Sequence, residues 1–265
     1  QQMIANNFET IRHIVENPKR NIDSASLKQI HSLITHKTLD SIAEEGQFRQ
    51  ADNVLVMDGI SGTIAHTPPS YTEIEDLTQD LYTFFNNNDS KNFIHPIIKG
   101  IIIHFILAYI HPFTDGNGRT ARSLIYWYLI KEGYWMTEYL SISRIIARSK
   151  RQYEKAFIYT EIDDNDLSYF ILYNLNVMSK AYLQLKAYLE KKSEEENSIH
   201  RFHHLDNLNE RQYQILKIIS EKPNTILTAK EIETRFGITN RTAHTDLGGL
   251  TKMNLLTEIK LNKRK

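Results

Sequence analysis

Apolar residues recur at helical spacing through most of the chain. In residues 6–18, Phe8, Ile11 and Ile14 repeat with a period near 3.6 residues, and the pattern stops before Pro18. The same spacing predicts further helices over 24–35 (with Ser24 or Ser26 as its cap), 71–86, 93–110, 119–132, 142–160 and 166–192. We therefore predict a mainly α-helical fold.

Residues 46–70 depart from this helical pattern. NVLVMDGISGTIAHTPPS (53–70) holds a short apolar run, a turn rich in Gly and Asp, a second short run and a Pro-Pro stop. Such punctuation is typical of a β-hairpin, which we expect over about 54–67. This segment would add a small β-hairpin to the helical fold.

The chain changes character towards its C-terminal end. The polar, aperiodic stretch 191–207 predicts a linker at 193–208, between a domain at 1–192 and a domain at 209–265. Residues 209–265 hold 11 Lys and Arg against six Asp and Glu, a net charge of +5, which leaves −5 for the first 208 residues. Charge alone therefore separates the two domains.

The last domain has the pattern of a winged helix-turn-helix. Thr228 and Glu231 have the spacing of a capping box at a helix start, Gly237 provides a turn, and Thr239 caps a second helix. A basic strand at 255–265 would form the wing. The domain is thus expected to be small and to contain three helices and a strand.

Composition narrows the functional classes. Lys and Arg together number 32, as do Asp and Glu, so net charge indicates no partner for the whole chain. The absence of cysteine excludes disulfides, thiolate metal sites and a thiol nucleophile. Apolar runs such as 101–110 are too short to span a membrane, and no signal peptide is evident. We expect a cytoplasmic protein with no membrane partner; homo-oligomerisation is left open.

A dense polar cluster, HPFTDGNGRTAR (111–122), interrupts one of the most apolar stretches of the chain. Gly116, Asn117 and Gly118 can turn several backbone N–H groups into one concavity, and the start of the next helix adds unpaired donors. Arg119 and Arg122 are three residues apart, so both can face the same anion. We therefore predict a phosphate site, although no GKS or GKT follows as in a P-loop.

His111 and Asp115 flank this cluster and add two further chemical roles. His111 follows the apolar helix and is a candidate general base near neutral pH. Asp115, beside the expected phosphates, is a candidate ligand of Mg²⁺. Each residue alone is more typical of a turn or a solvated helix face. Their joint occurrence within twelve residues favours a catalytic phosphate site.

HPFTDGNGRTAR resembles the signature of the Fic family, HxFx(D/E)GN(G/K)RxxR, and fills every specified position. GQFR (46–49), HTPP (66–69), the helix at 95–110 and SKRQYEKAF (149–157) extend the resemblance to about residues 5–190. Fic proteins typically transfer AMP from ATP to a hydroxyl side chain of a target protein. The resemblance therefore implies an enzyme that uses ATP and Mg²⁺ and acts on a Ser, Thr or Tyr hydroxyl.

The resemblance also implies a role for each residue of the cluster. On this model His111 is the general base, Asp115 binds Mg²⁺, Gly116, Asn117 and Gly118 form the anion hole for the α-phosphate, and Arg119 and Arg122 hold the β- and γ-phosphates. The GNGR form favours nucleotidyl transfer over phosphate transfer. Alternatives that remain are a Fic enzyme transferring phosphate, UMP or phosphocholine, and a DNA-binding regulator whose Fic core only senses nucleotide.

The predicted hairpin (the flap) and the helix at 149–157 would complete the nucleotide site. The flap would pair with an extended target segment, and Ala65 and His66 are assigned to the nucleotide. Tyr153 would line the adenine or ribose pocket, the alternative being a core aromatic residue. Glu161 stands where related sequences often have an Asn that contacts the nucleotide. An interior histidine is the alternative for His66.

Two further assignments concern regulation and the C-terminal domain. Residues 41–46 match the autoinhibitory pattern [S/T]xxxE[G/N], in which Glu45 would pair with Arg122, although they adjoin the flap and an inhibitory segment upstream is the alternative. In the C-terminal domain, the side chains expected to face DNA are Arg241, Thr242, His244 and Thr245. The alternative is a winged helix that docks a protein or dimerises.

Overall fold

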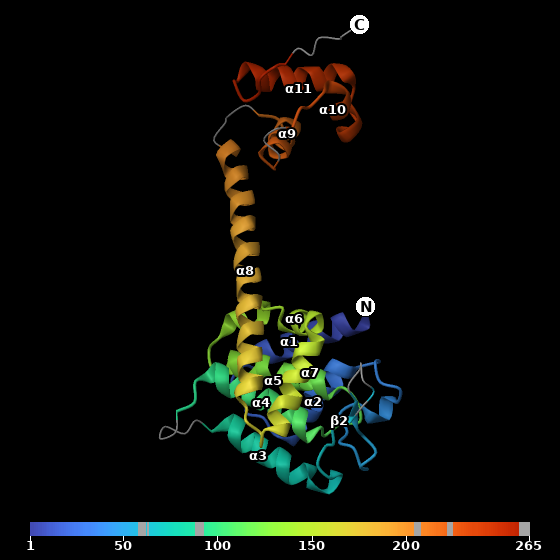
Figure 1. Ribbon diagram of the computed structural model, residues 1–265. Coiled ribbons are helices and arrows are strands. Elements are labelled where there is room, and N and C mark those ends of the chain that lie inside the picture. The colour runs from blue at the N-terminus through green and yellow to red at the C-terminus, as the bar shows by residue number, and fades with distance from the viewer. Residues whose placement is uncertain (58–61, 63, 88–92, 204–207, 222–224, 260–265) are drawn as a thin grey trace. The chain divides into compact units, whose positions relative to one another are not determined.

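Figure 1 shows the computed structural model, which describes residues 1–57, 62, 64–87, 93–203, 208–221 and 225–259. The chain divides into two compact units, Gln1–Leu185 and Lys186–Lys265. Among the described residues no helix has the length and apolar character needed to cross a membrane. Helices dominate both units, as the hydrophobic pattern predicts.

The helices of the first unit follow the predicted order (Figure 1). They are α1 (Gln2–Glu16), α2 (Ser24–Thr35), α3 (Ile74–Asn86), α4 (Pro96–Ile110), α5 (Asn117–Lys131), α6 (Ile142–Arg148), α7 (Lys150–Ile162) and α8 (Ser168–His203), with short 3₁₀ turns η1 (Ile42–Glu44), η2 (Tyr71–Glu73) and η3 (Trp135–Tyr139).

Three details differ from the sequence-based prediction. The helix expected over 142–160 divides at Ser149, which separates α6 from α7. α8 continues to His203 through most of the predicted linker, and residues 204–207 of that linker lie outside the described residues. α2 is capped by Asp23, whose carboxylate accepts from the Ser26 N–H at 2.8 Å. Ser26 instead completes the capping box from the third helical position.

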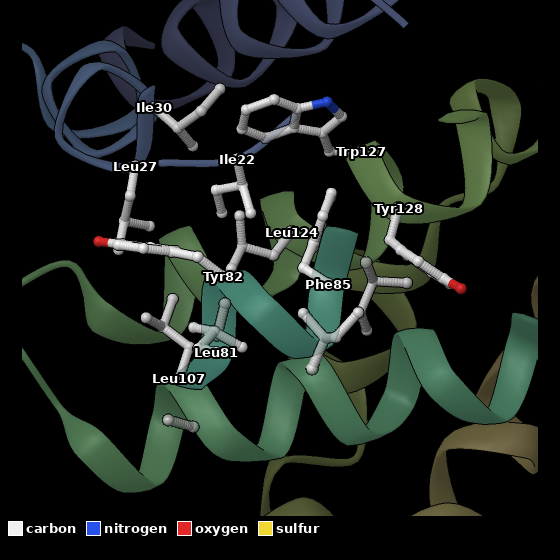
Figure 2. Packing of buried hydrophobic residues seen from close by; sticks show 14 of the residues in the cluster. Ile22, Leu27, Ile30, Leu81, Tyr82, Phe85, Leu107, Leu124, Trp127 and Tyr128 are labelled. Atoms are coloured by element: carbon white, nitrogen blue, oxygen red, sulfur yellow. The ribbon is translucent and has the colours of Figure 1, made fainter. Parts of the chain in front are cut away.

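The core of the first unit is built around α4 and α5. α1 and α2 pack on α5, α3 packs on α4, and α4 packs along α5. Their side chains meet in one buried cluster, which Figure 2 shows from close by. Because α4 is enclosed by other elements, it is apolar on nearly all sides instead of amphipathic. The loop between α4 and α5 therefore starts and ends on two rigid, buried helices.

The predicted hairpin forms a two-stranded antiparallel sheet, β1 (Val56–Met57) and β2 (Ile64–His66). Val56 pairs with His66 and Met57 with Ile64, with a register shift between the two pairs. Residues 58–61 and 63, in the turn, lie outside the described residues. β2 contacts α7, so the flap lies against the helical core.

The second unit confirms the helix-turn-helix. Its helices are α9 (Glu210–Glu221), α10 (Ala229–Phe236) and α11 (Asn240–Lys252). Thr228 and Glu231 form the predicted capping box, Gly237 ends α10 in the left-handed region (φ 62°), and Thr239 caps α11. Residues 255–259 form no strand, and the rest of the predicted wing, 260–265, lies outside the described residues.

The aromatic contact between α3 and α5 should carry much of the stability of the first unit. Phe85 is 1% exposed and meets Trp127 and Tyr128 edge to face, with centroid separations of 5.6 and 5.2 Å. We expect Phe85→Ala to lower the free energy of unfolding by about 3–5 kcal/mol, because the surrounding side chains cannot fill the cavity that the substitution leaves. Urea denaturation followed by circular dichroism measures the change. Phe93→Ala, at a site 78% exposed, is the control, and an equal loss there would contradict the assignment.

Candidate active site

His111 ends α4 in a left-handed conformation (φ 50°, ψ 56°). A non-glycine residue in this region costs about 1–2 kcal/mol, so its surroundings must hold it there. The His111 N–H donates to the Leu107 carbonyl at 3.0 Å, and Nδ1 lies 3.0 Å from the Ala108 carbonyl oxygen. The Nε of Arg49 donates to the His111 carbonyl, also at 3.0 Å. Both the backbone and the ring of His111 are therefore fixed.

The contact with Ala108 determines which ring nitrogen of His111 can act as a base. A carbonyl oxygen only accepts, so Nδ1 carries the proton and Nε2 keeps its lone pair. Burial lowers the pKa of His111, and the nearby His66 and Arg49 lower it further, against the opposing effect of the Ala108 hydrogen bond and of Asp115. The neutral, basic form is therefore favoured near pH 7.

Arg49 joins the beginning of the flap region to its end and to the loop after α4. It is 6% exposed, and its Nη1 donates to the Ala51 carbonyl at 3.0 Å and to Asp52 at 2.8 Å. Its Nη2 donates to the Pro69 carbonyl, and its backbone N–H donates to the Pro112 carbonyl at 2.9 Å. This role of Arg49 is not predictable from the sequence, where GQFR carries only a resemblance, because one Arg in a loop has no periodic signal.

His31 on α2 anchors the middle of the same loop, a role that was not predicted. Its Nε2 donates to the Asp115 carbonyl at 2.8 Å, and its Nδ1 accepts the Gly46 N–H at 2.9 Å. Its ring stacks on Phe113 with centroids 3.7 Å apart. Burial lowers the pKa of His31, which agrees with a neutral ring whose two nitrogens play opposite roles. On the sequence it looks like one more polar residue of an amphipathic helix.

The loop enters α5 through Gly116, which lies in the left-handed region at φ 85°. A Cβ at this position would lie 2.4 Å from Thr35 Cγ2 and 3.0 Å from His31 Nε2. Only glycine fits without a shift of the neighbouring helix. Because Gly116 has no side chain, it cannot cap the first-turn N–H groups of α5.

The side chain of Asn117 has a structural role that was not predicted. Its side-chain amide donates to the Phe113 carbonyl at 2.7 Å and accepts from the Phe113 N–H at 2.9 Å, which closes the loop. α5 begins at Asn117 and not near Arg119, so the N–H groups of Asn117, Gly118 and Arg119 form the open helix start. That open end, with its positive dipole, fits an anion.

Arg119 and Arg122 line one cavity of about 430 Å³, bounded by α1, α5 and the segment around 138–144. Arg144 adds a third guanidinium to this cavity and Glu138 a single carboxylate. Burial lowers the pKa of Arg122, its tyrosine neighbours raise it, and Arg119 lowers it further. The structure thus brings the two predicted arginines together in a positively charged space large enough for phosphate groups.

Asp115 is mostly exposed, and one of its oxygens lies 3.0 Å from Arg119 Nη2. Its other carboxylate oxygen accepts the Gly116 N–H at 2.5 Å. Among the described residues there is no group of three or more His, Cys, Asp or Glu side chains that could hold a metal ion. Asp115 is thus a single carboxylate at the open start of α5, and it could serve a hard cation only together with ligands from outside the chain.

Glu45 does not pair with Arg122 as predicted. Its carboxylate accepts the Lys37 N–H at 2.7 Å and lies 3.2 Å from His36 Nδ1. These partners follow the C-terminal end of α2, so Glu45 stabilises a turn there. The match to the inhibitory pattern is one of sequence only, because His36 and Lys37 hold the Glu45 carboxylate at this turn.

The aromatic and flap residues assigned to the nucleotide are engaged by the protein. The Tyr153 hydroxyl lies 3.2 Å from His104 Nε2, the two rings stack, and burial raises the pKa of Tyr153 to about 12. His66 is 5% exposed, and both of its ring nitrogens face protein acceptors. The contact of His66 with nucleotide stays a prediction, and in this structure both ring nitrogens are occupied by protein groups. Ala65 is half-buried on β2.

Comparisons with known proteins find matches in both units of the chain. Residues 21–129 match the model of the Fic/DOC family, and residues 211–265 match the model of an HTH domain. Over 91 residues the chain is 36% identical to a protein named protein adenylyltransferase Fic from Drosophila mojavensis, and 36% identical over 91 residues to one of the same name from Nematostella vectensis. These alignments cover 34% of this chain but only 16% and 19% of those relatives.

Solved structures share the fold. A Fic family protein from Desulfovibrio desulfuricans matches 95% of this chain and 68% of its own, with a TM-score of 0.61 at 19% identity. Fic-1 from C. elegans matches 72% of this chain and 52% of its own, with a TM-score of 0.55 at 20% identity. At these identities the likeness concerns the fold alone.

The close approach at Gly116 can be separated from its unusual backbone angle. Gly133 has a similar φ of 90°, but a Cβ there would meet nothing within 4 Å. We expect Gly116→Ala to destabilise the protein by about 1–3 kcal/mol more than Gly133→Ala, because only the first overpacks α2 and α5. Parallel urea titrations measure both free energies of unfolding. Equal losses would show that the backbone angle alone requires glycine at Gly116.

Proposed function

Because residues 21–129 belong to the Fic/DOC family, we propose that this protein transfers AMP from ATP to a hydroxyl group on a target protein. The observation that carries the proposal is the local chemistry around His111. A neutral imidazole with a free Nε2 stands at one end of a six-residue loop, and an uncapped helix start stands at the other. Two arginines in one cavity lie beyond that helix start.

The reaction follows from these groups. His111 Nε2 accepts the proton of the target hydroxyl as its oxygen attacks the α-phosphorus of ATP. The bond from the α-phosphorus to the bridging oxygen breaks, so the products are AMP-modified protein and pyrophosphate. The first-turn N–H groups of α5 stabilise the charge that grows on the α-phosphoryl oxygens, where fixed donors have most effect. The proton left on His111 returns to solvent.

The arginines and Asp115 hold the rest of the triphosphate. Arg119 exchanges its contact with Asp115 for phosphate oxygens, and Arg122 binds the same phosphates from its buried position. Asp115, once released, would hold Mg²⁺, which supplies positive charge to the leaving pyrophosphate. The apolar side chains Met57 and Ile64, about half exposed on the flap, suit a target backbone that adds to the strand edge.

Removal of the base gives the direct test. We expect His111→Ala to reduce incorporation of label from α-labelled ATP by at least about 100-fold, because general base catalysis is lost. The assay uses the full chain with Mg²⁺ and a cell lysate as the source of targets, followed by mass spectrometry for an AMP adduct.

The matched control is His13→Ala on α1, which lies outside the site and should retain activity. Transfer from γ-labelled ATP instead of α-labelled ATP would indicate phosphate transfer. Undiminished labelling by His111→Ala would refute the assigned base.

The second unit suits DNA binding, which we propose as a further activity of the chain. It matches an HTH domain model, and Arg241 and His244 are exposed on α11. The hydroxyls of Thr242 and Thr245 bond within their own helix or cap, to Thr239 and to the Arg241 carbonyl. Arg241 and His244 are therefore the stronger of the four candidate contacts with base edges or phosphates.

Salt-dependent binding tests this activity. We expect the full chain to bind a labelled DNA duplex more tightly at 50 than at 200 mM salt, by about tenfold or more, because phosphate contacts release counterions. Arg241→Ala should weaken binding by about fivefold or more. Lys217→Ala, exposed on α9, should change it little. Fluorescence anisotropy measures the affinities, and salt-insensitive or absent binding would favour a protein-docking role.

A further inference from the structure

The buried His66, in the flap, and the partly buried Glu161, on α7, form a pair beside the proposed base. His66 is the last residue of β2, and Glu161 is in the last turn of α7. The His66 and His111 rings are 6.4 Å apart. His66 Nε2 lies 2.7 Å from the Tyr109 carbonyl oxygen, two residues before His111. The pair therefore links three elements around one catalytic side chain.

The two acceptors around His66 determine its protonation. Its Nδ1 lies 2.6 Å from Glu161 Oε1, in the geometry of an ion pair more than of a linear hydrogen bond. A carbonyl oxygen and a carboxylate both only accept, so a neutral ring would direct one lone pair at an acceptor. An imidazolium avoids that repulsion on both sides.

Glu161 has the matching need for a positive partner. Its Oε1 is shielded from solvent, and among the described residues the His66 ring is the polar group against it. A buried carboxylate oxygen is strongly destabilised unless a cation or a donor offsets its lost hydration. Glu161 and His66 therefore satisfy each other as a charged pair.

We propose that Glu161 is a positioning residue that keeps His66 doubly protonated at the end of β2, and that this imidazolium acts on the base His111. The role of His111 as the base rests on the proposed function, whereas the state of His66 does not. The charge of His66 favours the neutral form of His111, in agreement with the lowered pKa of His111. The other charged groups that act on His111 are Arg49, from the loop before β1, and Asp115, from the loop before α5.

The pair also restrains the flap mechanically. The His66 ring packs against Tyr109 and Phe157, with centroids 5.1 and 5.9 Å apart. Loss of the Glu161 charge would leave this packing in place while removing the electrostatic effect on His111. The two contributions are therefore separable by a substitution that conserves shape.

Nitrogen-15 NMR of the histidine rings in the full chain tests the proposal without an activity assay. At pH 7.5 we expect both ring nitrogens of His66, assigned by their loss in His66→Gln, to resonate as protonated imidazolium. In Glu161→Gln we expect His66 to become neutral. The titration midpoint of His111 in the same spectra should rise by about half a pH unit or more, because a nearby positive charge is gone.

A matched control comes from the same helix. Glu154→Gln removes a carboxylate of α7 with a similar side-chain exposure, 20% against 18% for Glu161, that pairs with Lys150. It should leave His66 charged and the His111 midpoint unchanged, as should Glu161→Asp, which keeps the charge. Because the wild-type spectrum alone reports the state of His66, the test does not depend on whether Glu161→Gln folds.

Each outcome decides a separate part of the inference. A neutral His66 in the wild-type protein at pH 7.5 would overturn the charged pair. A neutral His66 in Glu161→Gln with an unshifted His111 midpoint would overturn the action on the base. If the enzyme transfers AMP, the acid limb of its pH–rate profile should move upward in Glu161→Gln by the same amount as the NMR midpoint, and an unmoved limb would overturn that link. Absence of any AMP transfer would refute the proposed function and leave the NMR result standing.

Discussion

The left-handed turn at His111, where α4 ends, is the constraint on which the arrangement of the site depends. It stops a buried apolar helix abruptly and directs the chain into a short loop that leads to α5. Because the conformation is unfavourable for histidine, the contacts from Leu107, Ala108 and Arg49 must maintain it. The same contacts orient the imidazole and leave Nε2 as its basic atom. Backbone strain and catalytic orientation thus have a common origin.

The polar groups of the loop divide into those that the protein satisfies and those that it leaves open. His31 holds the Asp115 carbonyl, and the Asn117 side chain holds both backbone groups of Phe113. The loop is therefore rigid before any ligand arrives. The first-turn N–H groups of α5 receive no side-chain cap from Gly116, and Arg122 lines a cavity. Preorganised donors of this kind stabilise developing negative charge without rearrangement.

The flap belongs to the same electrostatic system as the base. Arg49 connects both ends of the flap region to the backbone at His111, and His66 connects β2 to α4 and α7. A displacement of β2 would change the field at His111 as well as the edge offered to a target. In the proposed reaction, target binding at the flap and the basicity of His111 would therefore influence each other through a few short contacts.

Much of this protein follows from local sequence pattern. Helical periodicity predicts every major helix of the first unit, and Thr228, Gly237 and Thr239 predict the helix boundaries of the second, because these signals depend on near neighbours in the chain. HPFTDGNGRTAR likewise contains the base, the helix start and both arginines within one short stretch. Elements whose determinants lie within a few residues of each other are accessible from sequence.

What the tertiary structure alone decides are contacts between residues far apart in the chain. The roles of Arg49 and His31 depend on partners more than 60 residues away, and no spacing rule connects them. Glu45 matches an inhibitory pattern, yet its carboxylate is held at the end of α2. His66 and Glu161 look like two unrelated polar residues until folding buries them together. The sequence by itself determined the chemical groups of the site, and packing decided which of them are free to react, because burial selects the partner of each charge.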